Sequence, residues 1–201
     1  MAEQTNTATT AGTTKVSYRA LAILAVVAVF VYILDQVSKY FVVTELTEGA
    51  SVDVIGEFLQ FTFVRNPGAA FSIGTGSTWI FAILASAVAV FIVIFARRIR
   101  SLAWAGLFGL LLGGNLGNLT DRLTREPGFG IGHVIDFIHV YAFPAIFNIA
   151  DMAIVFSMVI FVILTIRGIR IDGTKHPKEP KKAEESAIEA DDAPLSSTDK
   201  D

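Results

Sequence analysis

Two aspartates without a nearby cation are the residues of this sequence whose types best suggest catalysis. Asp136 lies in GHVIDFIHVYAFP, with His133 and His139 three residues away but no lysine or arginine close by. Asp151 lies in FNIADMAIVF, which we interpret as the first half of a membrane-spanning helix, where a carboxylate costs at least about 2.5 kcal/mol. If the two carboxylates face each other, they must share a proton. One can then activate water while the other protonates a leaving amine, which is aspartic-protease chemistry.

Polar residues in two other apolar segments lie at the same depth as Asp151. Counting 1.5 Å per residue from the arginine that flanks each segment places Asp35, Asn118 and Asp151 about 24–27 Å into a hydrocarbon core about 30 Å thick. The three segments run in alternating directions, so the shared depth predicts one site in the outer leaflet. Asn148 is three residues from Asp151 and shares its helical face.

Basic neighbours give the other intramembrane acids a simpler explanation. Asp35 and Lys39 are four residues apart and can form an ion pair on one helix. Asp121 is adjacent to Arg122. Structural ion pairing is therefore the favoured interpretation of both acids.

The helix that carries Asn118 has a polar face and a small-residue face. Asn115, Asn118 and Arg122 fall within about 60° of one another. For the asparagines, a role that only joins helices is as open as a role in a site. Glycines 113, 114 and 117 lie largely on another side, where they let neighbouring helices approach closely.

The composition predicts an integral membrane protein. The chain is 53% hydrophobic and 17% charged, with a mean hydropathy of +0.58, which excludes an ordinary soluble domain. Four apolar runs are each near the roughly 20 residues that a spanning helix needs, namely Ala20–Val43, Thr78–Ala96, Leu102–Leu123 and Phe143–Ile166. The chain has no cysteine, which excludes disulfides, thiol catalysis and cysteine-ligated metals.

The basic residues predict the orientation of the four spans. They cluster before the first run, between the second and third, and after the fourth, and the positive-inside rule makes this side cytoplasmic. The loops 44–77 and 124–142 are then outside. In the first loop, residues 59–63 alternate between apolar and polar before an Asn-Pro-Gly turn, which predicts a strand in a small sheet on the membrane surface. We expect disordered tails over 1–14 and 172–201 around a membrane domain at 15–171.

Rival interpretations start from the same polar residues. A proton-coupled transporter would need polar residues through the whole membrane depth, but the inner halves of the runs lack charge. A Ser–Lys peptidase is disfavoured because Ser38 and Lys39 are adjacent and do not face each other on a helix. A zinc protease would need a spacing such as H-E-x-x-H, which is absent, although HVIDFIH could in principle bind a metal. A structural scaffold stays possible if the acids never meet.

Five motifs in order resemble the lipoprotein signal peptidases (signal peptidase II) over nearly everything from the first span to the fourth. They are DQVSK, RNPGAAFS, GNLTDR, VIDF and FNIAD. The resemblance implies an aspartyl protease that removes signal peptides from prolipoproteins, cutting on the N-terminal side of a cysteine that already carries a diacylglyceryl group. It implies an all-α membrane fold with four transmembrane helices, an extracytoplasmic β-cradle from loop 44–77 and a short interfacial helix.

The resemblance also implies roles for individual residues. Asp136 and Asp151 match the catalytic dyad. The residues that match those shaping and hydrogen-bonding the site are Asp35, Lys39, Asn66, Gly68, Asn118, Asp121, Arg122 and Asn148. The segment LTREPGFGIGHVI is longer than the usual connection, and its TREPGF part is expected to form a surface turn.

The same resemblance sets the expected surroundings of the protein. We expect a monomer in the bacterial cytoplasmic membrane, with both termini cytoplasmic and the active site near the outer leaflet. Its partners are lipidated prolipoproteins and membrane lipids. We expect no nucleic acid, no cofactor and no metal.

Overall fold

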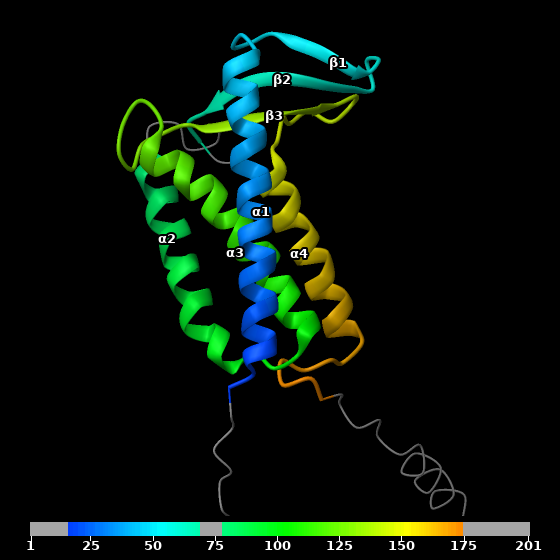
Figure 1. Ribbon diagram of the computed structural model, residues 1–201. Helices are drawn as coiled ribbons and strands as arrows, with labels where there is room; N and C mark the ends of the chain where they lie inside the picture. The colour runs from blue at the N-terminus through cyan, green and yellow to red at the C-terminus, as the bar shows by residue number, and fades with distance from the viewer. Residues whose placement is uncertain (1–15, 69–77, 175–201) are drawn as a thin grey trace, which may run out of the picture.

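Four long helices form the body of the protein (Figure 1). The computed structural model describes residues 16–68 and 78–174, so the predicted tails at 1–14 and beyond Thr174 lie outside the described residues. The helices are α1 (Tyr18–Glu45), α2 (Thr78–Phe95), α3 (Leu102–Thr124) and α4 (Ile149–Ile166), and the 3-10 helix η2 (Ala96–Arg98) continues α2. Each of the four is long and apolar enough to cross a membrane, which confirms the predicted spans.

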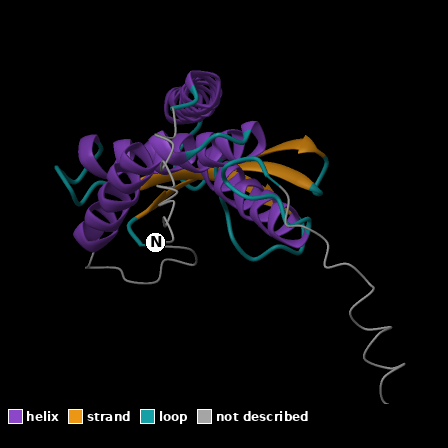
Figure 2. Cartoon of the chain, turned by 90° about the horizontal axis from the view of Figure 1, so that it is seen from below, coloured by secondary structure: helices purple, strands orange, loops and turns teal. Residues whose placement is uncertain are grey.

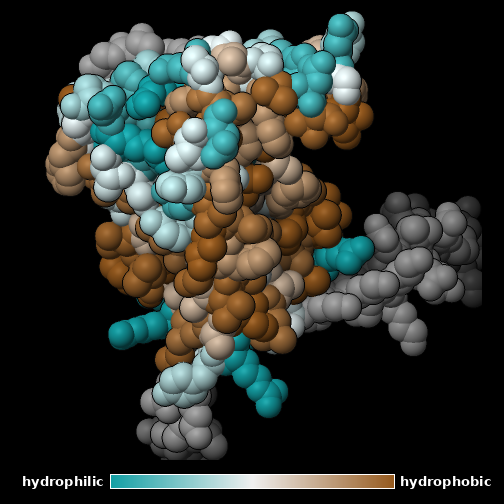
Figure 3. Space-filling model, turned by 45° about the horizontal axis from the view of Figure 1, so that its top comes forward, coloured by the Kyte–Doolittle hydropathy of each residue, from teal (hydrophilic) through white to brown (hydrophobic). Residues whose placement is uncertain are grey.

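Helix α3 is the centre of the bundle. Half of its apolar window is buried, against 17% for the window that covers α2 and 22% for α4. The outer helices therefore direct most of their apolar side chains away from the protein. Figure 3 shows the result as a hydrophobic surface over the helices. Such a surface is stable only where lipid covers it.

Small residues on α3 bring its neighbours close. A Cβ added at Gly113 would meet the backbone of Ala28 in α1, and one at Gly114 would meet the backbone of Ala150 in α4. A Cβ at Gly117 would contact the Asp35 carboxylate as well as Ala150. The predicted close approach is therefore confirmed, and it lets α1 and α4 place polar groups on the same side of α3.

A three-stranded antiparallel sheet lies across one end of the helices (Figures 1 and 2). Its order is β1 (Ser51–Ile55), β2 (Leu59–Asn66) and β3 (Val134–Val140). Val64 pairs with Asp136 in the register of β2 and β3. An apolar cluster that includes Val42 of α1, Phe63 and Ile135 fastens the sheet to the bundle.

The structure differs from the sequence-based expectations in two places. Residues 134–140 form a buried strand, whereas we expected a loop there. Helix α4 begins at Ile149, so residues 143–147 of the fourth apolar run precede the helix. The described parts of the two outer loops contain no short interfacial helix, and because residues 69–77 lie outside the described residues, that helix stays a prediction.

Candidate active site

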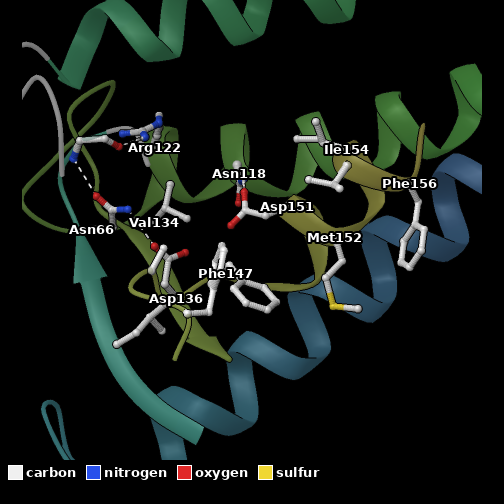
Figure 4. Close-up of a pocket in the computed structure, with 15 residues that line it drawn as sticks. Asn66, Asn118, Arg122, Val134, Asp136, Phe147, Asp151, Met152, Ile154 and Phe156 are labelled. Carbon is white, nitrogen blue, oxygen red and sulfur yellow. Dashed lines mark hydrogen bonds between the residues drawn. The ribbon is translucent and has the colours of Figure 1, made fainter. Parts of the chain in front are cut away.

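A cavity of about 650 Å³ opens where the sheet meets α3 and α4. Its polar wall contains Asp136 and Asp151, which point into the cavity from β3 and α4 (Figure 4). Its apolar wall is built largely by α4 and the residues before it, including Phe147, Met152 and Phe156. The two acids that the sequence singled out therefore share one cavity, and the condition on which the scaffold interpretation depended is not met.

Strand β3 holds Asp136 in a nearly water-free position. Its side chain is 3% exposed, and both carboxylate oxygens accept hydrogen bonds. Asn66 Nδ2 donates to one at 2.8 Å, and Asn148 Nδ2 donates to the other at 2.7 Å. Burial, and secondarily the charge of Asp151, raises the pKa of Asp136 to about 7 against these hydrogen bonds. Asp136 can therefore hold a proton at neutral pH.

The first turn of α4 explains how Asp151 is tolerated. Asn148 is the N-cap, and its side chain accepts a hydrogen bond from the Asp151 backbone N–H at 3.0 Å. In return, the Asp151 carboxylate accepts from the Asn148 backbone N–H at 3.2 Å, which completes a capping box. A carboxylate in the first turn also faces the positive end of the helix dipole. Asp151 therefore lies at the start of a helix, and not inside one as we expected from the apolar run.

One asparagine connects the two acids. Asn148 is fully buried, and it caps the helix that carries Asp151 while its amide group donates to Asp136. A second asparagine, Asn118 of α3, donates from Nδ2 to Asp151 at 2.8 Å. Neither amide is an acid or a base, and the hydrogen bonds of both hold the two carboxylates in place.

A buried lysine anchors this arrangement from behind. Lys39 Nζ lies 2.8 Å from Asp35 and 2.7 Å from Asp121, and all three side chains are fully buried. The same ammonium group donates to Asn118 Oδ1 at 2.9 Å. Asp35 also accepts from the backbone N–H of Ala150, next to Asp151. The ion pair between Asp35 and Lys39 is confirmed, and it supports the site directly.

Arg122 of α3 also lines the cavity, one helical turn after Asn118. Its Nη2 donates to the carbonyl oxygen of Gly68, and its guanidinium lies 5.1 Å from the centre of the Phe81 ring. Within the described residues, its Nη1 is buried and has no hydrogen-bond partner. A buried guanidinium N–H beside a cavity is available to a carbonyl oxygen of a bound molecule.

The expected pairing of Asp121 with Arg122 is wrong. Asp121 pairs with Lys39 and with Arg125, and the sequence reasoning missed the second of these partners. Arg125 is four residues after Asp121 on the same helical face, so the spacing was a usable signal. Asn115 also differs from Asn118, because it donates to the backbone of Ala85 and joins α3 to α2.

The strand at residues 134–140 separates the acid of HVIDFIH from its second histidine. Successive side chains of a strand point to opposite faces, so Asp136 and His139 lie on opposite sides of β3. The described residues hold no group of three histidines, cysteines or acids that could bind a metal ion.

A pair of carboxylates in a cavity among membrane-spanning helices defines a class, the membrane aspartyl peptidases. Burial raises the pKa of one member of the pair to about 7, and the cavity has a polar and an apolar wall. Such a pair can activate water near neutral pH.

Comparisons with known proteins give the family. The sequence model of the family described as signal peptidase (SPase) II matches residues 27–167. The lipoprotein signal peptidase of Leifsonia xyli subsp. xyli is 61% identical over 166 residues, which cover 83% of this chain and 77% of that protein. That of Streptomyces coelicolor is 49% identical over 158 residues, covering 79% and 77%. A bacterial membrane enzyme solved by the in meso method aligns with a TM-score of 0.69 at 32% identity, covering 83% of this chain and 97% of that one.

The chain belongs to the signal peptidase II family. It is an aspartyl endopeptidase of prolipoprotein processing, and the helical membrane fold with a small sheet agrees with the solved relative. The resemblance that the five motifs indicated is confirmed.

Proposed function

We propose that Asp136 and Asp151 are the catalytic dyad with which this protein removes signal peptides from diacylglyceryl-modified prolipoproteins. The observation that carries the assignment is that Asn148 forms hydrogen bonds with both acids, which line one cavity. The cut falls on the N-terminal side of the lipidated cysteine, so the products are a free signal peptide and a lipoprotein whose cysteine is the new N-terminus.

The two acids divide the chemistry between them. Asp136 carries the shared proton, in keeping with its pKa of about 7, and Asp151 is the base. Asp151 takes a proton from water as the water oxygen attacks the scissile carbonyl carbon, and Asp136 gives its proton to the carbonyl oxygen. In the second step a hydroxyl of the tetrahedral intermediate returns a proton to Asp136 as the carbon–nitrogen bond breaks, and the amine of the cysteine leaves with the proton that Asp151 took from water, which restores the dyad.

The surrounding residues position the acids and the substrate. Asn118 and Asn148 orient the carboxylates, and the cluster of Asp35, Lys39 and Asp121 holds Asn118 from behind. Arg122 offers a carbonyl oxygen of the substrate its buried Nη1, which has no hydrogen-bond partner within residues 16–68 and 78–174. The Asn66–Gly68 segment forms the rim of the cavity beside Asp136.

The membrane gives the substrate its orientation. The apolar wall of the cavity continues onto outward-facing residues of α4, such as Val155 and Phe156, which are 61% and 56% exposed. The diacylglyceryl chains lie along this surface in hydrocarbon while the peptide reaches the dyad. We place the sheet and the dyad at the outer face of the bacterial cytoplasmic membrane and both termini inside, and we expect a monomer to suffice.

Conservative substitutions of the two acids test the assignment. Asn is nearly isosteric with Asp and keeps its hydrogen bonds, but it cannot accept and return a proton. Asp136→Asn and Asp151→Asn should each abolish release of the signal peptide from a lipidated precursor in detergent, as measured by mass spectrometry. The double variant should be scarcely worse than either single variant, because the residues act as one unit.

A matched control is Asp53→Asn, which makes the same chemical change in the exposed strand β1. There the Asp53 carboxylate accepts a hydrogen bond from Gln60 Nε2 at 2.7 Å. This variant should keep wild-type activity. Near-normal cleavage by either dyad variant would remove that residue from the catalytic role.

A further inference from the structure

A second cavity, of about 550 Å³, lies at the end of the helices away from the sheet. Its walls come from the end of α2, the start of α3 and the residues that follow α4. Phe95, Trp104 and Ile169 form an apolar floor, and Arg98, Arg170 and Asp172 are the charged residues around it. Nothing in the cleavage chemistry uses this cavity.

The chain after α4 folds back to build the cavity. Gly168 adopts a φ of 62°, which lets the backbone reverse at the end of the helix. The carbonyl oxygen of Ile171 then accepts hydrogen bonds at 3.0 Å from the backbone N–H groups of Arg100 and Ser101. Trp104 Nε1 donates to the carbonyl oxygen of Ile169 at 2.9 Å. The cavity is therefore held by defined contacts, and residues 168–172 form an ordered part of the fold.

The charge around the cavity is positive. Residues 96–102 and 166–174 contain five arginines and one acid, Asp172. Hydrogen bonds from Thr174, and then the charges of Arg170 and Arg100, lower the pKa of Asp172, so it is ionised at neutral pH. The charged residues of the cavity walls are Arg98, Arg170 and Asp172, so the walls have a net charge of +1.

The cavity is located where a phospholipid headgroup would meet the protein. It lies at the ends of three membrane-spanning helices, at the level where the apolar surface gives way to arginines. The neighbouring surfaces of α2 and α4 expose large apolar side chains, among them Phe91, Ile94 and Ile166, along which acyl chains can lie. An aromatic residue with a polar N–H, such as Trp104, is typical of this membrane interface.

We propose that this cavity binds the headgroup of an anionic phospholipid of the inner leaflet, with Arg98 and Arg170 contacting the phosphate. Charge complementarity selects an anionic lipid over a zwitterionic one, because a basic residue near a membrane surface favours anionic lipid by about 1 kcal/mol, or about fivefold. The net charge of +1 thus predicts a preference of about fivefold for phosphatidylglycerol over phosphatidylcholine.

The tryptophans of the chain allow a direct test. The sequence has two, Trp79 at the start of α2 and Trp104 beside the cavity. In the full chain with Trp79→Phe, emission comes from Trp104 alone. This protein is placed in phosphatidylcholine vesicles that contain lipid brominated near the headgroup end of its chains. The apparent association constant from quenching of Trp104 should be about fivefold higher for brominated phosphatidylglycerol than for brominated phosphatidylcholine. Equal quenching by the two lipids would overturn the proposal.

Two double variants with the same charge change separate a site from general surface charge. Arg98→Gln/Arg170→Gln should abolish the preference for phosphatidylglycerol or reverse it, because Asp172 is then the charged residue left in the walls. Arg97→Gln/Arg167→Gln removes two exposed arginines outside the cavity and should keep most of it. Equal losses in both variants would assign the effect to diffuse charge and overturn the site. If the first variant does not fold, Arg98→Gln alone makes the same comparison with Arg97→Gln.

A soluble competitor separates a lipid from a free phosphate as the ligand. Millimolar sn-glycerol 3-phosphate in the vesicle buffer should leave the quenching by brominated phosphatidylglycerol unchanged, because it lacks acyl chains to lie along α2 and α4. Displacement of the lipid by this competitor would show a phosphate site without lipid specificity, against the proposal.

Discussion

The ammonium group of Lys39 lies 2.9 Å from Asn118 Oδ1, and this contact fixes which side of the Asn118 amide faces Asp151. Lysine has only donors, so the atom that it contacts must be the amide oxygen. The NH₂ group of Asn118 then points to the Asp151 carboxylate. Asn148 Nδ2 donates to the same oxygen at 3.2 Å and reinforces the orientation. A fully buried lysine thus controls a hydrogen bond to Asp151.

Lys39→Met should destabilise the protein strongly. The substitution leaves Asp35 and Asp121 buried without their shared cation, which costs about 3–5 kcal/mol for a broken buried pair. Thermal unfolding in detergent measures the change. Arg125→Met is the control, because Arg125 contacts the same Asp121 but is 22% exposed, and it should lower the melting temperature far less. Equal losses would show that Lys39 is not the anchor of the cluster.

Substitutions of Asn148 should separate its two roles. Serine is a good N-cap but is too short to replace the amide contact with Asp136, so Asn148→Ser should retain most of the stability and still slow cleavage markedly. Asn148→Ala should slow cleavage as well and also lose about 0.5–2 kcal/mol of stability with the cap. Unfolding and turnover are measured on the same samples. An Asn148→Ser enzyme with full activity would show that the bond to Asp136 is dispensable.

The raised pKa of Asp136 predicts how stability and activity depend on pH. Because the folded pKa of about 7 exceeds 3.8, the ordinary value of an aspartate, the folded state binds more protons between these two pH values. Stability should therefore fall as pH rises from about 4 to about 7, by up to roughly 4 kcal/mol from this residue. Asp136→Asn cannot ionise and should lose less stability over the same range.

Cleavage should decline in parallel as pH rises through about 7, because the proposed acid loses its proton. The rate profile belongs to the dyad as a pair and should be bell-shaped. A profile that stays flat from about pH 6 to about pH 9 would contradict the assignment of Asp136 as the acid.

Labelling of introduced cysteines tests the orientation in the membrane. The chain has no cysteine, so background labelling is absent. Cysteines at Glu57 and Gly128, in the sheet and the loop before β3, should react with an impermeant maleimide in intact cells. A cysteine at Ser186, in the C-terminal region, should react only after lysis. The reverse pattern would place the sheet and the dyad on the cytoplasmic side.

The sequence predicted which residues come together better than it predicted their local structure. Asp35, Asn118 and Asp151 were grouped because polar residues at one depth in apolar segments indicate a shared site, and the structure connects all three to Lys39 or to Asn148. Strand β3 was missed because VIDFIHV is buried on both faces and lacks the alternation that marks a half-buried strand.

The start of α4 was placed too early for a similar reason. Residues 143–147 are as apolar as the membrane-spanning helix that follows them, and the cap at Asn148 marks the boundary. The partner of Asp121 could not be settled either, because adjacency in sequence favours Arg122 while the packing of α1 on α3 brings in Lys39. Long-range contacts of this kind depend on the register of helices, which local patterns do not encode.

Two glycine substitutions on α3 should have opposite effects. Gly114→Ala places a Cβ against the backbone of Ala150, so α4 must move away from α3, at a cost of about 1–3 kcal/mol. Because Ala150 precedes Asp151, the shift should also lower the rate of cleavage. Gly106→Ala lies on the same helix with no neighbour within 4 Å, and it should raise stability by up to about 1 kcal/mol through helix propensity. Unfolding and turnover of the two variants, measured side by side, decide the matter. If Gly114→Ala behaves like Gly106→Ala in both assays, close packing of α3 on α4 is not what holds Asp151 in its position near Asp136.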